Sequence, residues 1–158
     1  MQFETTRFGI IDVDEGEVIT FTQPIIGFHD ARRFVILPGP DEDAVKWLQS
    51  VDSGDLAFLM MDPRSVVPDY EVRIGGAELR ELGVQDASGL DIYTLVVVPA
   101  DPKEVRTNLR APILVNPKDR LGKQTVLDRS DYPVQFFLAR GQESREGPKE
   151  VVHARTDT

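Results

Sequence analysis

Apolar and polar residues along the chain follow the short periods that are typical of β-strands. Runs that predict strands span residues 33–37, 45–51, 70–74 and 92–98. The run Leu56–Met61 is apolar at every position, which predicts a central strand with both faces covered. Turn-forming Pro, Gly and Asp residues separate these runs, so the pattern predicts many short strands.

Further strands are expected towards the two ends of the chain. The apolar positions from Phe8 to Ile25 are interrupted by the acidic stretch 12–17, which predicts a hairpin turn because Asp and Gly tolerate tight-turn backbone angles. Residues 105–114 and 124–127 predict two strands with a polar connection between them. The apolar segment 132–138 is compatible with more than one type of element.

One short helix is expected at Gly76–Leu82, with Gly83 as its C-terminal cap. A helix of about two turns forms only when it packs against the rest of the protein. The elements together predict a mostly β fold, a single-domain antiparallel β-barrel-like structure with one or two short helices. The domain is expected to cover residues 1–138, and residues 139–158 are expected to form a polar, mobile tail.

Composition and the lack of targeting signals predict a cytoplasmic protein. The 158 residues contain no Cys, which excludes disulfides, iron–sulfur clusters and thiolate zinc sites. Residues 1–7 lack the basic head and apolar stretch of a secretory signal. No apolar run reaches the roughly 18 residues that span a bilayer, so we expect no membrane partner.

The net charge is −9, and it is concentrated in the first part of the chain. Residues 1–91 hold 7 basic and 18 acidic side chains, whereas residues 92–158 hold 11 basic and 9 acidic ones. An acidic surface repels phosphate backbones, which argues against direct nucleic-acid binding. The same surface attracts a basic protein partner, although it also has the simpler role of keeping a protein soluble.

Candidate catalytic groups are few and poorly placed. The two histidines, His29 and His153, have no metal-binding spacing, and Asp12 with Asp14 or Asp41 with Asp43 lies in a polar turn without apolar neighbours that raise a pKa. The glycine pair before the predicted helix has no lysine at phosphate-loop spacing. We therefore expect a protein that is not an enzyme and that needs no metal or cofactor.

Large side chains beside turns leave two further interpretations open. Trp47, Phe58 and Tyr70 are expected to be core residues, but they are also of the type that lines ligand pockets and anchors partners. One alternative is therefore a small-molecule-binding β-barrel with a pocket lined by these three rings. Another is a structural subunit of a larger assembly.

Several segments stand in a characteristic order and spacing. They are Phe8–Asp14, Val18–Phe21, Gly27-Phe28, Arg33–Leu37, Trp47–Asp52, Asp55–Phe58, Met61–Pro63, Asp69–Val72, Thr107–Pro117 and Gly122–Leu127. The most specific are the Trp-Leu-Gln-Ser run and the Asn-Leu-Arg-Ala-Pro-Ile stretch. Together these segments resemble the flagellar assembly factor FliW family.

The resemblance implies a compact, mostly antiparallel β-barrel-like fold without catalytic activity and with two protein partners. One partner is flagellin, bound in the cytoplasm before export. The other is CsrA, an RNA-binding translational repressor of flagellin synthesis. In such a switch the free protein sequesters CsrA and relieves repression, and newly made flagellin competes for it and releases CsrA.

Partner contacts are expected near the strand ends of the matched central motifs. Carboxylates there suit a basic partner, and an aromatic residue among them suits an anchor. The predicted contact residues are Asp52, Asp55, Asp62, Asp69, Tyr70 and Glu71. An alternative for Asp52 and Asp62 is that they cap turns, and Asn108 and Asn116 are assigned to structural roles at strand ends.

Overall fold

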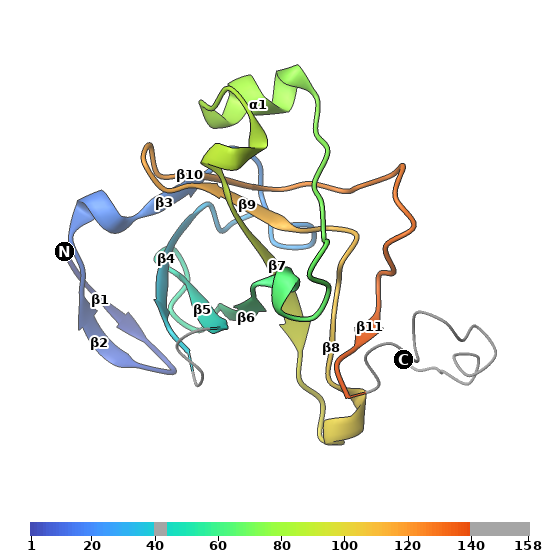
Figure 1. Cartoon of the computed structure of the whole chain (residues 1–158). Coiled ribbons are helices and arrows are strands. Elements are labelled where there is room, and N and C mark those ends of the chain that lie inside the picture. Colours follow the sequence, from blue (N-terminus) through green and yellow to red (C-terminus); the bar gives the residue numbers. More distant parts are fainter. Residues whose placement is uncertain (40–43, 140–158) are drawn as a thin grey trace.

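The computed structural model describes residues 1–39 and 44–139, and the chain is mostly β there (Figure 1). From residue 140 the predicted tail lies outside the described residues, as does the pair Asp41 and Asp43. The strands in chain order are β1 (Gln2–Thr5), β2 (Gly9–Asp12), β3 (Ile19–Phe21), β4 (Arg33–Pro38), β5 (Val45–Ser50), β6 (Ala57–Met61), β7 (Asp91–Val97), β8 (Arg106–Thr107), β9 (Ile113–Asn116), β10 (Leu121–Gln124) and β11 (Phe136–Phe137).

Seven of these strands close into a barrel within the described part of the chain. They follow the order β7-β6-β5-β4-β3-β10-β9, and β9 pairs with β7 to complete the ring. Strand β7 does this because Asp91–Tyr93 pairs with β9, whereas Val96-Val97 pairs with β8. Neighbours in the ring are antiparallel except for β3 and β10, which are parallel. The predicted mostly β, barrel-like fold is confirmed.

The predicted helix is confirmed with its bounds, as α1 (Gly76–Leu82). Gly83 has φ +77° and donates its N–H to the carbonyls of Arg80 and Leu79, which is how a left-handed residue ends a helix. Four single 3-10 turns complete the described helical structure: η1 (Glu15–Glu17), η2 (Pro63–Ser65), η3 (Ala87–Gly89) and η4 (Pro102–Glu104).

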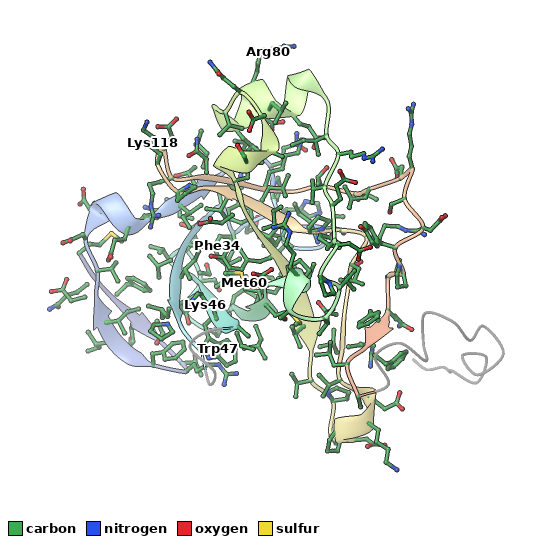
Figure 2. The ribbon with its side chains drawn as sticks, viewed as in Figure 1. Phe34, Lys46, Trp47, Met60, Arg80 and Lys118 are labelled. Atoms are coloured by element: carbon green, nitrogen blue, oxygen red, sulfur yellow. The ribbon has the colours of Figure 1, made fainter. Side chains whose placement is uncertain are left out.

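The barrel interior holds one apolar cluster. Figure 2 shows Phe34 and Met60 inside the ring, whereas Arg80 and Lys118 point away from the molecule. Phe34 and Met60 are both fully buried. The buried members are Ile19, Phe21, Ile25, Ala31, Phe34, Leu48, Met60, Ile113 and Val115.

A second apolar cluster lies on the outer face of β7 and β9. Leu114 belongs to it whereas its neighbours Ile113 and Val115 face the barrel interior, so both faces of β9 are buried. Helix α1 covers this face, and Leu82 is its fully buried residue. The buried members are Val67, Tyr70, Val72, Leu82, Leu90, Ile92, Leu109, Leu114, Leu127 and Phe136.

The prediction of a hairpin turn at residues 12–17 is wrong. Strand β2 pairs with the earlier strand β1, and η1 occupies the acidic stretch. The true hairpin turn is at Thr6–Phe8, where the Thr5 hydroxyl accepts a hydrogen bond from the Phe8 N–H at 2.8 Å. The polar residues at 12–17 instead connect this two-stranded ribbon to the barrel. A connection of this kind has the same residue composition as a hairpin turn.

Three other strand predictions need correction. Residues 70–74 alternate between buried and exposed positions as predicted, but they form no strand ladder. The strand expected at 105–114 is divided into β8 and β9 because the chain turns at Asn108–Pro112, where the Asn108 Oδ1 accepts the N–H groups of Arg110 and Ala111. The strand expected at 124–127 instead starts at Leu121 and ends at Gln124.

Candidate protein-binding surface

Asp52 follows β5 and holds the start of β4 in place. Its Oδ2 accepts the backbone N–H groups of Arg32 and Arg33, both at 2.9 Å. Its Oδ1 accepts two hydrogen bonds from the Arg33 guanidinium, from Nε at 2.9 Å and from Nη2 at 2.8 Å. Burial opposes ionisation, but these hydrogen bonds outweigh it and hold the pKa of Asp52 below its usual range. Both carboxylate oxygens are thus already in use within the protein.

Asp55 is exposed and borders a hollow of about 400 Å³ beside the same turn. The Ser53 hydroxyl donates to its Oδ1 at 2.7 Å, which orients the carboxylate. The aromatic ring of Phe28 is 38% exposed at this hollow and packs edge-on against Phe58. The lining residues are Gly27, Phe28, His29, Asp30, Ala31, Ser53, Asp55 and Leu56.

Asp62 caps η2, since its Oδ1 accepts the Arg64 N–H at 2.9 Å. The alternative that this residue caps a turn is therefore confirmed. Its side chain is still exposed, and one oxygen forms the cap while the carboxylate charge faces solvent. A capping role and a partner contact are compatible for this residue.

Tyr70 is only 2% exposed, so its side chain does not face solvent and instead fixes the position of the neighbouring residues. Its hydroxyl donates to the Leu109 carbonyl at 2.6 Å, its ring lies 4.6 Å from that of Tyr132, and burial raises its pKa. The Tyr132 hydroxyl in turn accepts the Glu71 N–H at 2.9 Å. The two rings thus fix the exposed Asp69 and Glu71 next to residues 127–132.

A groove of about 870 Å³ runs between the extended segment 71–75 and residues 126–132. Glu71 lies on its wall and pairs with Arg73 at 3.0 Å. Val126 contributes an apolar side chain that is 44% exposed. The lining residues are Glu71, Arg73, Ile74, Gly75, Glu78, Val126, Leu127, Asp128, Arg129, Ser130, Asp131 and Tyr132.

The six predicted contact residues therefore lie in three places. Asp52 and Asp55 lie at the β5–β6 turn, Asp62 caps η2, and Asp69 to Glu71 lie on the segment that leads into the groove. The structure gives their positions but contains no partner, so their role as contacts stays a prediction.

The three aromatic rings of the small-molecule alternative do not share a pocket. Trp47 packs under the Arg7 guanidinium at 4.2 Å and against Phe8. Phe58 packs with other phenylalanines, while Tyr70 pairs with a tyrosine in the outer cluster. The pocket that this alternative requires is not formed by these residues.

The described ranges also bear on the requirements of a metal site and of a membrane-spanning helix. Residues 1–39 and 44–139 contain no group of three or more His, Asp or Glu side chains that could hold a metal ion. His29 is exposed on the rim of the smaller hollow. None of the helices in these ranges is both long and apolar enough to cross a bilayer.

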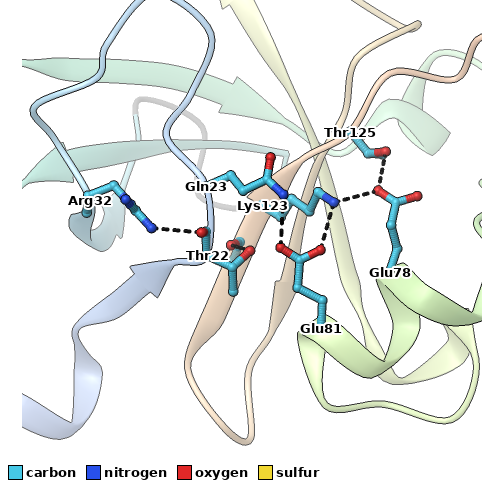
Figure 3. A network of polar contacts seen from close by, with 8 residues as sticks. Thr22, Gln23, Arg32, Glu78, Glu81, Lys123 and Thr125 are labelled. Atoms are coloured by element: carbon cyan, nitrogen blue, oxygen red, sulfur yellow. Dashed lines mark hydrogen bonds and ion pairs between the residues drawn. The ribbon is translucent and has the colours of Figure 1, made fainter.

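An ionic network that the sequence analysis missed docks α1 on the barrel (Figure 3). The Lys123 Nζ lies 3.0 Å from Glu78 Oε2 and 2.9 Å from Glu81 Oε1. Burial disfavours the charged lysine, but the two carboxylates more than offset this and raise its pKa. Hydrogen bonding, chiefly from Lys123, lowers the pKa of Glu81. The available signal was the i, i+3 spacing of the two glutamates, which places them on one helix face.

Comparison with known proteins identifies the family. The model of the FliW protein family matches residues 2–138. The chain belongs to the FliW family. The flagellar assembly factor FliW of Thermoanaerobacter pseudethanolicus is 39% identical over 136 residues, covering 85% of this chain and 91% of that protein. The one from Alkaliphilus metalliredigens is 37% identical over 139 residues, covering 87% and 86%.

A solved FliW structure has the same fold. A crystal structure of the flagellar assembly factor FliW superposes with a TM-score of 0.79 and 30% identity, covering 87% of this chain and 96% of that one. The barrel and its single short helix are therefore the FliW fold. The resemblance found in the sequence motifs is confirmed.

Proposed function

We propose that this FliW-family chain is a non-enzymatic, cytoplasmic regulator whose domain at residues 1–138 binds flagellin and CsrA in turn. When flagellin is scarce, the chain holds CsrA and so relieves repression of flagellin synthesis. When flagellin accumulates, it takes the place of CsrA, which is released. The coupling is one of mass action and needs no chemical step.

Family membership is the observation that carries this proposal, and the name of its relatives, flagellar assembly factor, supports a binding role rather than catalysis. The exterior agrees with a basic partner. Exposed carboxylates border both the small hollow and the groove. Asp30 and Asp55 lie at the hollow, and Asp128 and Asp131 lie at the groove. Complementary charge of this kind raises association rates and helps to exclude wrong partners.

The predicted contact residues enter the proposal with two different roles. Asp55, Asp62, Asp69 and Glu71 are exposed and are proposed as direct contacts. Asp52 instead holds the start of β4, and Tyr70 holds the segment that carries its two acidic neighbours. Substitution of a contact residue should weaken binding alone, whereas substitution of a holding residue should also lower stability.

A competition experiment tests the switch. The chain is loaded with CsrA from its own organism, flagellin is added, and the complexes are separated by size-exclusion chromatography. The expected result is that flagellin releases CsrA in proportion to the amount added. Failure of CsrA to bind, or a ternary complex in which CsrA stays bound, contradicts the proposal.

A further inference from the structure

The ribbon formed by β1 and β2 has one open edge. The ribbon is a two-stranded sheet separate from the barrel sheet (Figure 1). The outer side of β1 is covered by the β5–β6 turn, where the Thr6 N–H donates to the Gly54 carbonyl at 3.0 Å and a Cβ on Gly54 would collide with the Glu4 carbonyl oxygen. Strand β2 pairs with β1 alone among the described strands.

The hydrogen-bond pattern shows which backbone groups face this edge. Met1 and Val13 exchange hydrogen bonds at 3.0 and 2.9 Å, so they form a bonded pair. Bonded and non-bonded pairs alternate along an antiparallel ladder, so Ile11 with Phe3 is again a bonded pair. The N–H and C=O groups of Ile10 and Asp12 therefore point away from β1, and no residue of 1–39 or 44–139 bonds to them.

Side chains at the same edge are unusual for an unprotected strand. Ile10 is 70% exposed, and Glu4 and Asp12 lie beside it on the same face of the ribbon. Three more exposed carboxylates, on Asp14, Glu15 and Glu17, follow directly. Edge strands are protected by short length, charged side chains, Pro or a bulge. The strand Gly9–Asp12 is short and carries the Asp12 carboxylate, but it contains neither Lys nor Pro and pairs in continuous register, so its edge is open to a basic segment.

We propose that the outer edge of β2 is a docking site for an extended segment of a partner protein that adds a third strand to the ribbon. On the face that continues the exposed face of the ribbon, the segment carries a β-branched side chain with a basic one two residues away on each side. Its backbone bonds to Ile10 and Asp12, a β-branched residue covers the Ile10 side chain, and its basic residues meet the surrounding carboxylates. The proposal does not rest on flagellin or CsrA as partners.

A second copy of the chain is a poorer occupant of the edge. Pairing β2 with β2 of another copy brings two sets of the same carboxylates together, which is unfavourable. A basic segment instead gains from each of these charges. The charge pattern therefore favours a different protein whose extended segment is basic.

Trp47 supplies a built-in reporter, because it is the only tryptophan of the chain and holds the hairpin turn of the ribbon. The Arg7 guanidinium lies over its ring at 4.2 Å, and Phe8 packs edge-on against it at 6.0 Å. We expect a strand added to β2 to shift this turn relative to the ring. Indole emission is sensitive to such a change, so binding can be followed without a label.

The test uses the full chain and the capped peptide acetyl-Thr-Lys-Thr-Val-Thr-Lys-Thr-amide, whose Val and two Lys side chains lie on one face of the strand. Binding is followed by Trp47 emission and by amide NMR shifts. We expect saturable binding, with the amide signals of Ile10 and Asp12 among those that move most. A twin peptide with Glu in place of Lys should bind at least about tenfold more weakly. A peptide of the original sequence that is N-methylated at the backbone amides facing β2 should not bind, since it cannot form the inter-strand hydrogen bonds.

Ile10→Thr and Ile26→Thr form a matched pair, because both isoleucines are exposed to almost the same degree, 70% and 68%. Ile10→Thr should weaken peptide binding about fivefold, whereas Ile26→Thr should leave it unchanged. Equal binding of the methylated peptide, or equal loss in both variants, overturns the proposal. So does protection of the Ile10 amide that grows with protein concentration without peptide, which would assign the edge to a second copy.

Discussion

The Lys123 Nζ lies 2.9 Å from Glu81 Oε1, and this contact joins α1 to β10 across 42 residues of sequence. The ammonium group is nearly buried and also contacts Glu78. Lys123 therefore supplies the positive charge that compensates the partly buried carboxylates of Glu78 and Glu81 on the helix. The docking of α1 combines this ionic contact with the apolar contacts of Leu82.

Lys123→Met should destabilise the fold by about 2 kcal/mol, because it leaves the carboxylates of Glu78 and Glu81 without a cation in a partly buried site. The measurement is urea unfolding followed by circular dichroism. Lys118→Met is the matched control, since that lysine is exposed, and its effect should stay within about 0.5 kcal/mol. Equal effects of the two substitutions would show that the network contributes nothing.

Stability should fall as the pH is lowered through the acidic range. The pKa values of Asp52 and Glu81 lie below their ordinary values of 3.8 and 4.5 in the folded state. Each carboxylate therefore stabilises the fold above its ordinary pKa, and this contribution is lost as the pH falls through the folded-state pKa. Urea midpoints from neutral pH down to about pH 3 should show the fall. The fall should be smaller in the Asp52→Asn, Glu81→Gln double variant, and an identical profile would contradict the assignment.

Gly122→Ala should cost about 1–3 kcal/mol, because a Cβ there would lie 2.8 Å from Phe21 Cε1 and 3.1 Å from Ile19 Cγ2. Both neighbours are fully buried in the barrel interior and have little room to move. Gly16→Ala is the control, since a Cβ at that glycine meets no atom within 4 Å. Thermal unfolding of the two variants separates crowding from a general effect of losing glycine. A Gly122→Ala protein as stable as the Gly16→Ala protein would show that the parallel β3–β10 contact is loose.

The double substitution Asp69→Lys, Glu71→Lys should weaken binding of a basic partner at least about tenfold, chiefly through a slower association rate. Both residues are exposed and the Glu71–Arg73 pair is a surface pair, so stability should hardly change. Binding kinetics with CsrA and with flagellin give the measurement. Asp91→Lys is the control, because it reverses an exposed charge that borders neither the small hollow nor the groove. Unchanged association in the double variant would remove these two residues from the proposed surface.

Local signals in the sequence predict the central part of the fold well. Gly83 fixes the end of α1 because a left-handed residue is needed there. The apolar run at 57–61 forms the predicted strand, but its first three residues are only half-buried, so its two faces are less fully covered than predicted. Residues 70–74 show the limit of the method. Tyr70 and Val72 are buried as their alternation predicts, but the Glu71 N–H bonds to a tyrosine hydroxyl rather than to a neighbouring strand.

Long-range pairing is the part that the sequence does not predict. Nothing in the segment 12–17 tells a turn from a crossing, since both require Asp and Gly, so the pairing of β2 with β1 was missed. The Lys123 network was missed for a related reason. Its lysine lies in a stretch with the composition of a loop, and only the barrel brings that stretch under the helix.

The parallel contact between β3 and β10 also sets the order in which the chain can be completed during synthesis. The Thr22 N–H donates to the Gly122 carbonyl at 2.9 Å, although the two residues are 100 positions apart. While the ribosome is still making the intervening chain, β3 lacks one of its two neighbours and the ring stays open. The barrel therefore closes late in translation, and its interior remains accessible to chaperones until the strand containing Gly122 has emerged from the exit tunnel.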